Sequence, residues 1–255
     1  MRVADAFSSG PALIVYLCMG DPDIKTTIEA ARRVIAAGAD LLELGLPHSD
    51  PIADGPVIQA AAQRAIAAGM DTDRYFQAAG KIEGIPKVFM GYYNMVFQRG
   101  VERFAADCAA SGISGLIVPD LPPEEANPLM QACKRYDLDL IFLVAPNTPQ
   151  QRAEEIAAMS SGFVYLVSRS GVTGARKEVL DSTRELIARV PAVRPRAVGF
   201  GISTPDQAAQ MVAAGAEGVI VGSACVDLVG QGRLDQLEEL VMGMKKEMIK
   251  VAPKR

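Results

Sequence analysis

Eight short apolar runs alternate with longer amphipathic stretches along the chain, and this alternation limits the fold more than any other feature. The runs are almost continuously apolar, which is typical of parallel strands covered on both faces. Eight strand–helix repeats in 255 residues predict a single (β/α)8 TIM barrel, with a doubly wound open sheet as the alternative. The predicted strands are Ala12–Leu17, Asp40–Gly45, Lys87–Gly91, Gly115–Pro119, Asp139–Val144, Phe163–Val167, Arg196–Phe200 and Glu217–Val221.

The stretches between the runs predict helices. In the first stretch, Ile24, Ile28, Ala31 and Ile35 fall on one helical face. No low-complexity linker divides the pattern, so residues 1–255 are expected to form one catalytic domain. Further helices are predicted at Val101–Ala110, Glu124–Tyr136, Gln150–Met159, Lys177–Val190, Pro205–Ala214 and Asp227–Ile249.

Composition excludes several classes of protein. The net charge of −4 gives no reason to expect nucleic acid or an anionic membrane as partner. We see neither a signal peptide nor an apolar run long enough to span a membrane, which favours a cytoplasmic protein. Four scattered cysteines and a single histidine do not form a usual zinc pattern, so no metal is predicted. Cys18 has no histidine near it in sequence that would activate it as a nucleophile.

Two carboxylates stand out as candidate catalytic groups. Glu43 interrupts the apolar run Leu41–Gly45, where a charge is unfavourable unless it is paired or used. In a barrel it would lie near the mouth, with a pKa raised by burial. Asp54 follows in a stiff loop just before Pro56, a natural first residue of a helix. The alternatives are a buried ion pair for Glu43 and a helix N-cap for Asp54.

Three later glycine-containing loops predict a phosphate site. They are residues 168–174 after the sixth strand, 199–203 after the seventh and 222–224 after the eighth. Glycines permit close backbone approach, helix N-termini supply free N–H groups, and barrels often bind phosphate between the last two loops. The loop Ser168–Ala175 is long and polar, and we interpret it as a candidate lid over the site.

The residues around both carboxylates closely resemble the tryptophan synthase alpha subunit family. The resemblance runs in order over nearly the whole chain. It is carried by Gly20-Asp21-Pro22, Leu42–Pro56, Met90–Asn94, Val118–Pro122, Ser168–Gly174 and Gly199–Ser203. It implies a (β/α)8 barrel that cleaves indole-3-glycerol phosphate to indole and glyceraldehyde 3-phosphate. It also implies a beta subunit that receives the indole in an alpha2beta2 complex. Pyridoxal phosphate is expected only in that partner, and no cofactor in this chain.

The resemblance also implies roles for individual residues. Glu43 would be the general acid and base, and Asp54 would accept a hydrogen bond from the indole N–H. The matching positions for substrate are Tyr16, Tyr165 and Thr173; those for phosphate are Gly174, Gly201, Gly222 and Ser223; and those facing the partner are Pro47, Asp50 and Asp120.

The chain departs from the family pattern in three places. The segment before Ala12 is short, so the helix that covers the barrel floor is expected to be stunted. Cys18 stands where threonine is frequent, and His48 replaces a phenylalanine beside the partner loop. We expect a contact or packing role for His48, with an effect on the pH dependence of partner binding.

Three other functions fit parts of the pattern. A stand-alone indole-releasing lyase would have the same active-site residues. A non-catalytic regulatory barrel would not need both Glu43 and Asp54. A sugar-phosphate isomerase would require a suitable lysine or histidine base, which we do not find.

Overall fold

The strands form one parallel ring. The structure, a computed structural model, describes residues 1–168, 176–199 and 201–252. Neighbouring strands run in the order β5-β4-β3-β2-β1-β9-β8-β7-β6, and every pairing is parallel. The strands are β1 (Ala12–Cys18), β2 (Leu41–Gly45), β3 (Lys87–Met90), β4 (Gly115–Ile117), β5 (Asp139–Ile141), β6 (Leu143–Val144), β7 (Val164–Val167), β8 (Arg196–Gly199) and β9 (Gly218–Val221).

The two ends of this strand order belong to one chain segment, so the ring closes. β5 pairs with β4, β6 pairs with β7, and only Phe142 separates β5 from β6. The backbone N–H of Tyr165 donates to the carbonyl oxygen of Phe142 at 3.0 Å, which continues the ladder through the gap. The nine segments are therefore the eight strands of a (β/α)8 barrel with the fifth interrupted. This confirms the barrel and excludes the open sheet.

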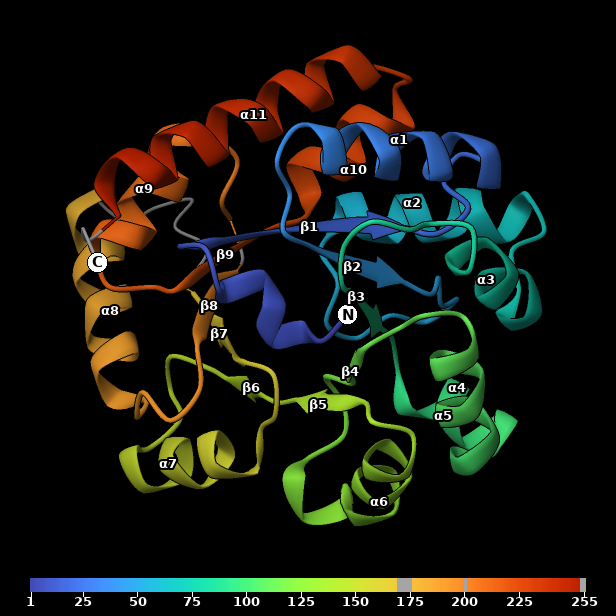
Figure 1. Ribbon diagram of the computed structural model, residues 1–255, viewed down its shortest axis with the longest axis horizontal. Helices are drawn as coiled ribbons and strands as arrows, with labels where there is room; N and C mark the ends of the chain where they lie inside the picture. Colours follow the sequence, from blue (N-terminus) through green and yellow to red (C-terminus); the bar gives the residue numbers. More distant parts are fainter. Residues whose placement is uncertain (169–175, 200, 253–255) are drawn as a thin grey trace.

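Alternation along the strands separates two apolar layers. One set of side chains, which includes Ile14, Leu41, Val88, Ile141 and Ile220, meets inside the ring. The intervening residues of the same strands belong to the outer apolar layer, which lies between the ring and the helices that surround it in Figure 1. Burial on both faces explains why the strands read as continuous apolar runs.

A short N-terminal helix fills the barrel floor. The 3-10 helix η1 (Val3–Phe7) lies across the middle of the ring in Figure 1. Val3 and Phe7 are buried there, and the Phe7 and Phe163 ring centroids lie 5.7 Å apart. The covering helix is short, as expected, yet its two apolar side chains still reach the interior.

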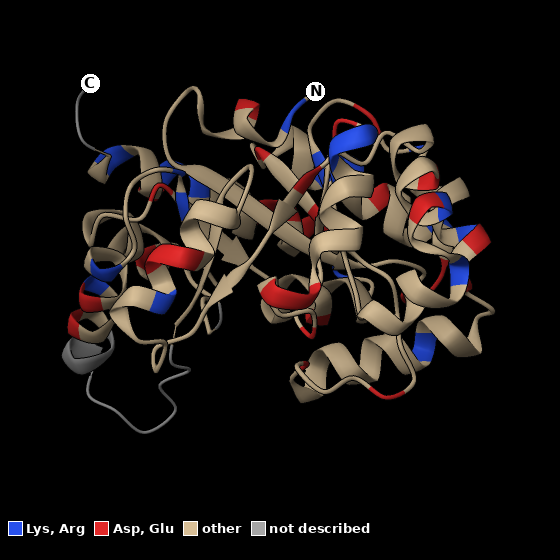
Figure 2. Ribbon diagram, turned by 90° about the horizontal axis from the view of Figure 1, so that it is seen from below, with Lys and Arg blue, Asp and Glu red and all other residues tan. Residues whose placement is uncertain are grey.

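The helices surround the ring, and charged residues of both signs lie mainly on them and on the loops (Figure 2). No described helix is long and apolar enough to cross a bilayer. The helices are α1 (Ile24–Ala36), α2 (Pro56–Ala67), α3 (Thr72–Ala79), α4 (Tyr93–Arg99), α5 (Val101–Ala110), α6 (Asn127–Arg135), α7 (Gln150–Met159), α8 (Arg176–Arg189), α9 (Pro205–Ala213), α10 (Ser223–Gly230) and α11 (Leu234–Val251), with a 3-10 turn η2 at Pro123–Glu125.

The predicted helices differ from these in two places. The single helix expected over Asp227–Ile249 is two helices, α10 and α11, because Gly232 takes a left-handed φ of 70° between them. The helix expected from Glu124 begins at Asn127, after the separate turn η2. Helices α3 and α4 were not predicted.

Candidate active site

β2 carries Glu43 into the barrel. Leu42 and Leu44 pack outward, so Glu43 between them faces the interior, level with Tyr16 on β1 and Val88 on β3. Its side chain is buried, and within the described part of the chain its Oε2 has no hydrogen-bond partner. Burial, together with the nearby charge of Asp54, raises the pKa of Glu43 to about 8. This carboxyl can therefore exchange a proton near neutral pH, and no described residue forms the ion pair of the alternative.

Asp54 lies in the loop between β2 and α2 and is held by a tyrosine. The hydroxyl of Tyr92 donates to Asp54 Oδ2 at 2.9 Å and accepts the backbone N–H of Ala53 at 3.0 Å. Gly55, not Asp54, is the N-cap residue of α2, so the N-cap alternative is wrong. Burial raises the pKa of Asp54, and the hydrogen bond from Tyr92 opposes that rise. The half-buried carboxylate is thus free to accept a further hydrogen bond from a ligand.

Tyr92 is a site residue that the sequence reasoning did not assign. Its motif, Met90–Asn94, contributed to the family resemblance without a role for any single residue. The hydroxyl is fixed by two partners, and burial raises the pKa of Tyr92 to about 12. Tyr92 therefore stays protonated and keeps donating to Asp54. Its place directly after β3, at the mouth of the barrel, was the available signal.

Two further tyrosines line the same interior. Tyr16 on β1 and Tyr165 on β7 are both candidate substrate contacts. Burial raises both phenol pKa values, and the charges of Glu43 and Asp54 raise them further. The structure thus brings the four residues Glu43, Asp54, Tyr16 and Tyr165 within electrostatic reach of one another, although they come from three strands and a loop.

Two of the predicted phosphate residues lie at the start of α10. Gly222 is the N-cap residue of this helix, and Ser223, its first residue, is exposed. A Cβ atom added to Gly222 would lie 3.6 Å from the Cβ of Tyr16, so the helix start adjoins the tyrosine. Free N–H groups at a helix start suit an oxyanion.

The remaining phosphate and lid positions are only partly described. Gly201 follows β8 with a left-handed φ of 73° that favours glycine. Thr173, Gly174 and all of the candidate lid after Ser168 lie outside the described residues.

The candidate partner residues lie on loops that follow the strands. Asp50 and Asp120 are exposed, whereas Pro47 is buried in the isolated chain. Both carboxylate oxygens of Asp120 accept the backbone N–H of Tyr93, at 2.9 and 3.1 Å, at the start of α4. Nδ1 of His48 accepts the N–H of Asp50 at 2.9 Å, and the His48 ring meets Tyr92 edge-on at 5.2 Å. His48 therefore links the candidate partner loop to the tyrosine that holds Asp54.

Neither a cysteine nucleophile nor a metal centre fits the described residues. Burial raises the pKa of the Cys18 thiol far above neutrality, so it stays protonated. Among the described side chains, no group of three or more His, Cys, Asp or Glu could hold a metal ion.

Comparison with known proteins identifies the family. The model of the tryptophan synthase alpha chain family matches residues 4–252. The chain is 54% identical over 242 residues to the tryptophan synthase alpha chain of Methanosarcina barkeri, covering 92% of each. A tryptophan synthase structure from Mycobacterium tuberculosis superposes with a TM-score of 0.89 at 39% identity, covering 97% of this chain and 98% of that one. The structure of the tryptophan synthase a2b2 complex from Pyrococcus furiosus gives 0.86 at 37% identity, with 93% and 98% covered. The chain belongs to the tryptophan synthase alpha chain family.

Proposed function

We propose that this chain is the alpha subunit of a tryptophan synthase and a carbon–carbon lyase. In this role it cleaves indole-3-glycerol phosphate into indole and glyceraldehyde 3-phosphate. The observation that carries the proposal is the buried Glu43 carboxyl, whose Oε2 has no partner in the described structure and whose pKa is raised to about 8. A second carboxylate and a helix start suited to phosphate lie around the same interior.

Glu43 would move the proton that the reaction requires. Its carboxyl donates a proton to C3 of the indole ring, which leaves a positive charge on the indolenine. It then takes the proton of the hydroxyl on the adjacent glycerol carbon. As that hydroxyl becomes an aldehyde, the C–C bond breaks and its electron pair returns to the ring. The carboxyl ends in its starting form, and a pKa near the working pH suits both transfers.

Asp54 would stabilise the charge that develops on the ring. Its carboxylate, oriented by Tyr92, accepts a hydrogen bond from the indole N–H and opposes the positive charge of the indolenine. Tyr16 and Tyr165 would line the space for the indole and glycerol groups. The N–H groups at Gly222 and Ser223, with Gly201, Thr173 and Gly174, would hold the phosphate.

Indole release by Glu43→Gln tests the proposal. The amide fills the same space but cannot shuttle the proton, so we expect kcat to fall by roughly two to four orders of magnitude. Asp54→Asn should also reduce kcat, because an amide loses the charge that opposes the indolenine cation. Wild-type protein that releases no indole, alone or with a beta subunit, would contradict the proposal. Indole release at the background level in both wild type and Glu43→Gln would favour the non-catalytic barrel.

The beta subunit is the proposed partner, since the Pyrococcus furiosus relative is described in an a2b2 complex. We propose that Pro47, Asp50 and Asp120 face it, that it holds pyridoxal phosphate, and that this chain holds no cofactor. The four cysteines are free thiols, which supports a reducing, cytoplasmic location. Co-purification with a beta subunit and a rise in indole release on its addition test the assembly. Activity that the beta subunit leaves unchanged would favour the stand-alone lyase.

A further inference from the structure

An ion pair between an exposed arginine and a buried aspartate joins α2 to the loop after β1. Arg64 of α2 donates from Nε to Asp21 Oδ1 at 2.7 Å and from Nη2 to Asp21 Oδ2 at 2.9 Å. Asp21 is 1% exposed, so the planar guanidinium is the group that balances its charge. A bidentate contact of this kind fixes the orientation of the guanidinium relative to the carboxylate as well as the distance between them.

The loop that presents Asp21 is itself held in place. The buried Thr27 hydroxyl accepts the N–H of Gly20 at 3.1 Å and lies 3.2 Å from the carbonyl oxygen of Asp21. The loop continues directly from β1, which carries Tyr16. The charges of Asp21, Arg64 and Asp54 all act on the thiol of Cys18 at the end of β1, so the ion pair and the candidate site are both near this residue. Asp21 is therefore a fixed anchor beside the candidate site.

A third element, α10, packs against the same ion pair. A Cβ atom added to Gly230 would lie 2.5 Å from Arg64 Nη2 and 3.6 Å from Asp21 Oδ2. The last turn of α10 thus lies directly on the guanidinium, and α10 neighbours both α2 and β1 (Figure 1). The first turn of α10 carries Gly222 and Ser223. The ion pair consequently lies where the helix that follows Asp54 meets the helix that begins with the proposed phosphate donors.

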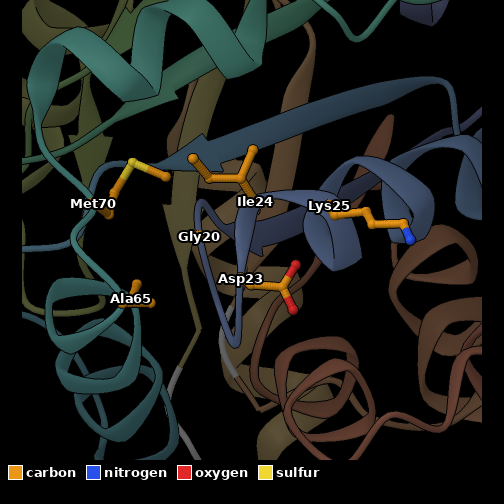
Figure 3. Close-up of a pocket in the computed structure, with 7 residues that line it drawn as sticks. Gly20, Asp23, Ile24, Lys25, Ala65 and Met70 are labelled. Carbon is orange, nitrogen blue, oxygen red and sulfur yellow. The ribbon is translucent and has the colours of Figure 1, made fainter.

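A pocket lies next to the ion pair. Figure 3 shows the loop and the start of α1 facing the end of α2 across this pocket of about 310 Å³. Because side chains do not fill this space, the loop packs against the end of α2 only around the pocket, where Gly20 and Met70 lie close together. The ion pair adds a directional restraint between the two elements. The pocket, which contains no candidate site residue, is lined by Gly20, Asp23, Ile24, Lys25, Ala65, Ala68 and Met70.

We infer that Asp21 and Arg64 are positioning residues that set the distance between Asp54 and the phosphate-binding end of α10. The inference rests on the proposed function, because only a substrate with both an indole and a phosphate spans the two ends. Such a substrate gains from binding at both ends when their spacing is fixed. Indole or phosphate alone occupies one end and does not depend on that spacing.

Arg64→Lys is the first test. Lysine keeps the positive charge but cannot form the bidentate contact with the Asp21 carboxylate. We expect kcat/KM for indole-3-glycerol phosphate to fall by roughly ten- to a hundredfold, through KM and kcat together. The dissociation constants of indole alone and of inorganic phosphate alone should stay within about twofold of wild type, because the two ends remain intact. The pH profile should keep its shape, because Glu43 is untouched.

Arg196→Lys is the matched control. Arg196 and Glu217 also form a bidentate ion pair, in which Arg196 Nε donates to Glu217 Oε2 at 2.9 Å. This pair lies where β8 begins, at the opposite end of the barrel from the candidate site. This variant should lower thermal stability as Arg64→Lys does, with little change in kcat/KM. Gly230→Ala is a second variant, which keeps both charges and displaces the guanidinium with the new methyl group. It should reproduce the pattern of Arg64→Lys.

Two results would overturn the inference while the proposed function stands. One is a kcat/KM for Arg64→Lys and Gly230→Ala that matches the Arg196→Lys control. The other is a loss of affinity for indole and for phosphate in proportion to the loss of kcat/KM. An inactive wild-type protein would instead overturn the proposed function, and this inference with it.

Discussion

Glu43 is the residue on which the candidate chemistry depends. Its burial should change how the free energy of unfolding depends on pH. Its folded pKa of about 8 lies above the ordinary value of 4.5, so the folded state holds a proton that the unfolded chain releases. Stability from this group is complete below pH 4.5 and is lost as the pH rises toward 8. A carboxyl kept in an apolar interior thus makes the fold less stable near pH 8 than in acid.

Glu43→Gln should therefore become more stable relative to wild type as the pH rises. Between pH 4.5 and 8, we expect the difference in free energy of unfolding to shift by about 2–5 kcal/mol in favour of the variant, since only wild type carries the titrating group. Urea unfolding of both proteins at the two pH values measures the shift. A difference that does not change with pH would show that the carboxyl is not buried as described.

Tyr92 holds Asp54 through a hydrogen bond, and removing the Tyr92 hydroxyl tests what that bond contributes. Tyr92→Phe deletes the bond to Asp54 Oδ2 and the acceptor for the Ala53 N–H. We expect kcat/KM to fall by roughly tenfold or more, because a hydrogen bond to a charged group contributes about 1.5–3 kcal/mol. The pKa of Asp54 should rise without its donor. Tyr93→Phe, one residue along, is the control; an equal loss there would argue against a specific role.

At the scale of elements, a buried lysine joins the ends of two helices. Lys87, at the start of β3, donates from Nζ to the carbonyl oxygens of Ala79, Ile82 and Ser111 at 2.7, 2.6 and 3.1 Å. Two of these acceptors close α3 and α5, where helices leave carbonyl groups without partners. Burial lowers the pKa of Lys87, and the three carbonyl oxygens stabilise its charged form.

Lys87→Met should destabilise the fold and spare the chemistry. The methionine fills the space but leaves the carbonyl oxygens of Ile82 and Ser111 without the lysine donor, and that of Ala79 with only the Ile82 N–H. We therefore expect the free energy of unfolding to fall by about 2–4 kcal/mol. Activity per folded molecule should be unchanged, because Lys87 lies at the end of β3 away from Tyr92. Chemical denaturation and indole release measure the two quantities. A normal stability would mean that water satisfies these carbonyl groups.

The strands could be predicted closely, whereas several helices could not. Each strand is an apolar run between turn residues, so its burial follows from local sequence and the predicted ends lie within two residues of the observed ones. The interruption of the fifth strand at Phe142 was not predicted. Helix α4 has seven residues and a single buried one, Val96, so it lacks the repeated apolar face that predicts a helix. The break between α10 and α11 depends on the left-handed conformation of Gly232, which periodicity does not show.

At the scale of the molecule, the candidate site combines local and long-range information. Glu43 could be recognised because a charge inside an apolar run is unusual wherever the strand lies. The partnership of Asp54 with Tyr92 could not, because 38 residues separate them and the parallel pairing of β2 with β3 brings together the loops that carry them. The ion pair between Asp21 and Arg64 could not be predicted either, because the two residues lie far apart in the sequence.

His48 extends this connection to the proposed assembly, because it contacts both the candidate partner loop and Tyr92. Its Nδ1 accepts the N–H of Asp50, which only an unprotonated nitrogen can do. Phenylalanine at this position keeps an aromatic ring beside Tyr92 but removes that acceptor. We therefore expect activation of indole release by a beta subunit to be weaker in His48→Phe than in wild type. Activation ratios of the two proteins measured at one pH test this, and equal ratios would assign His48 to packing alone.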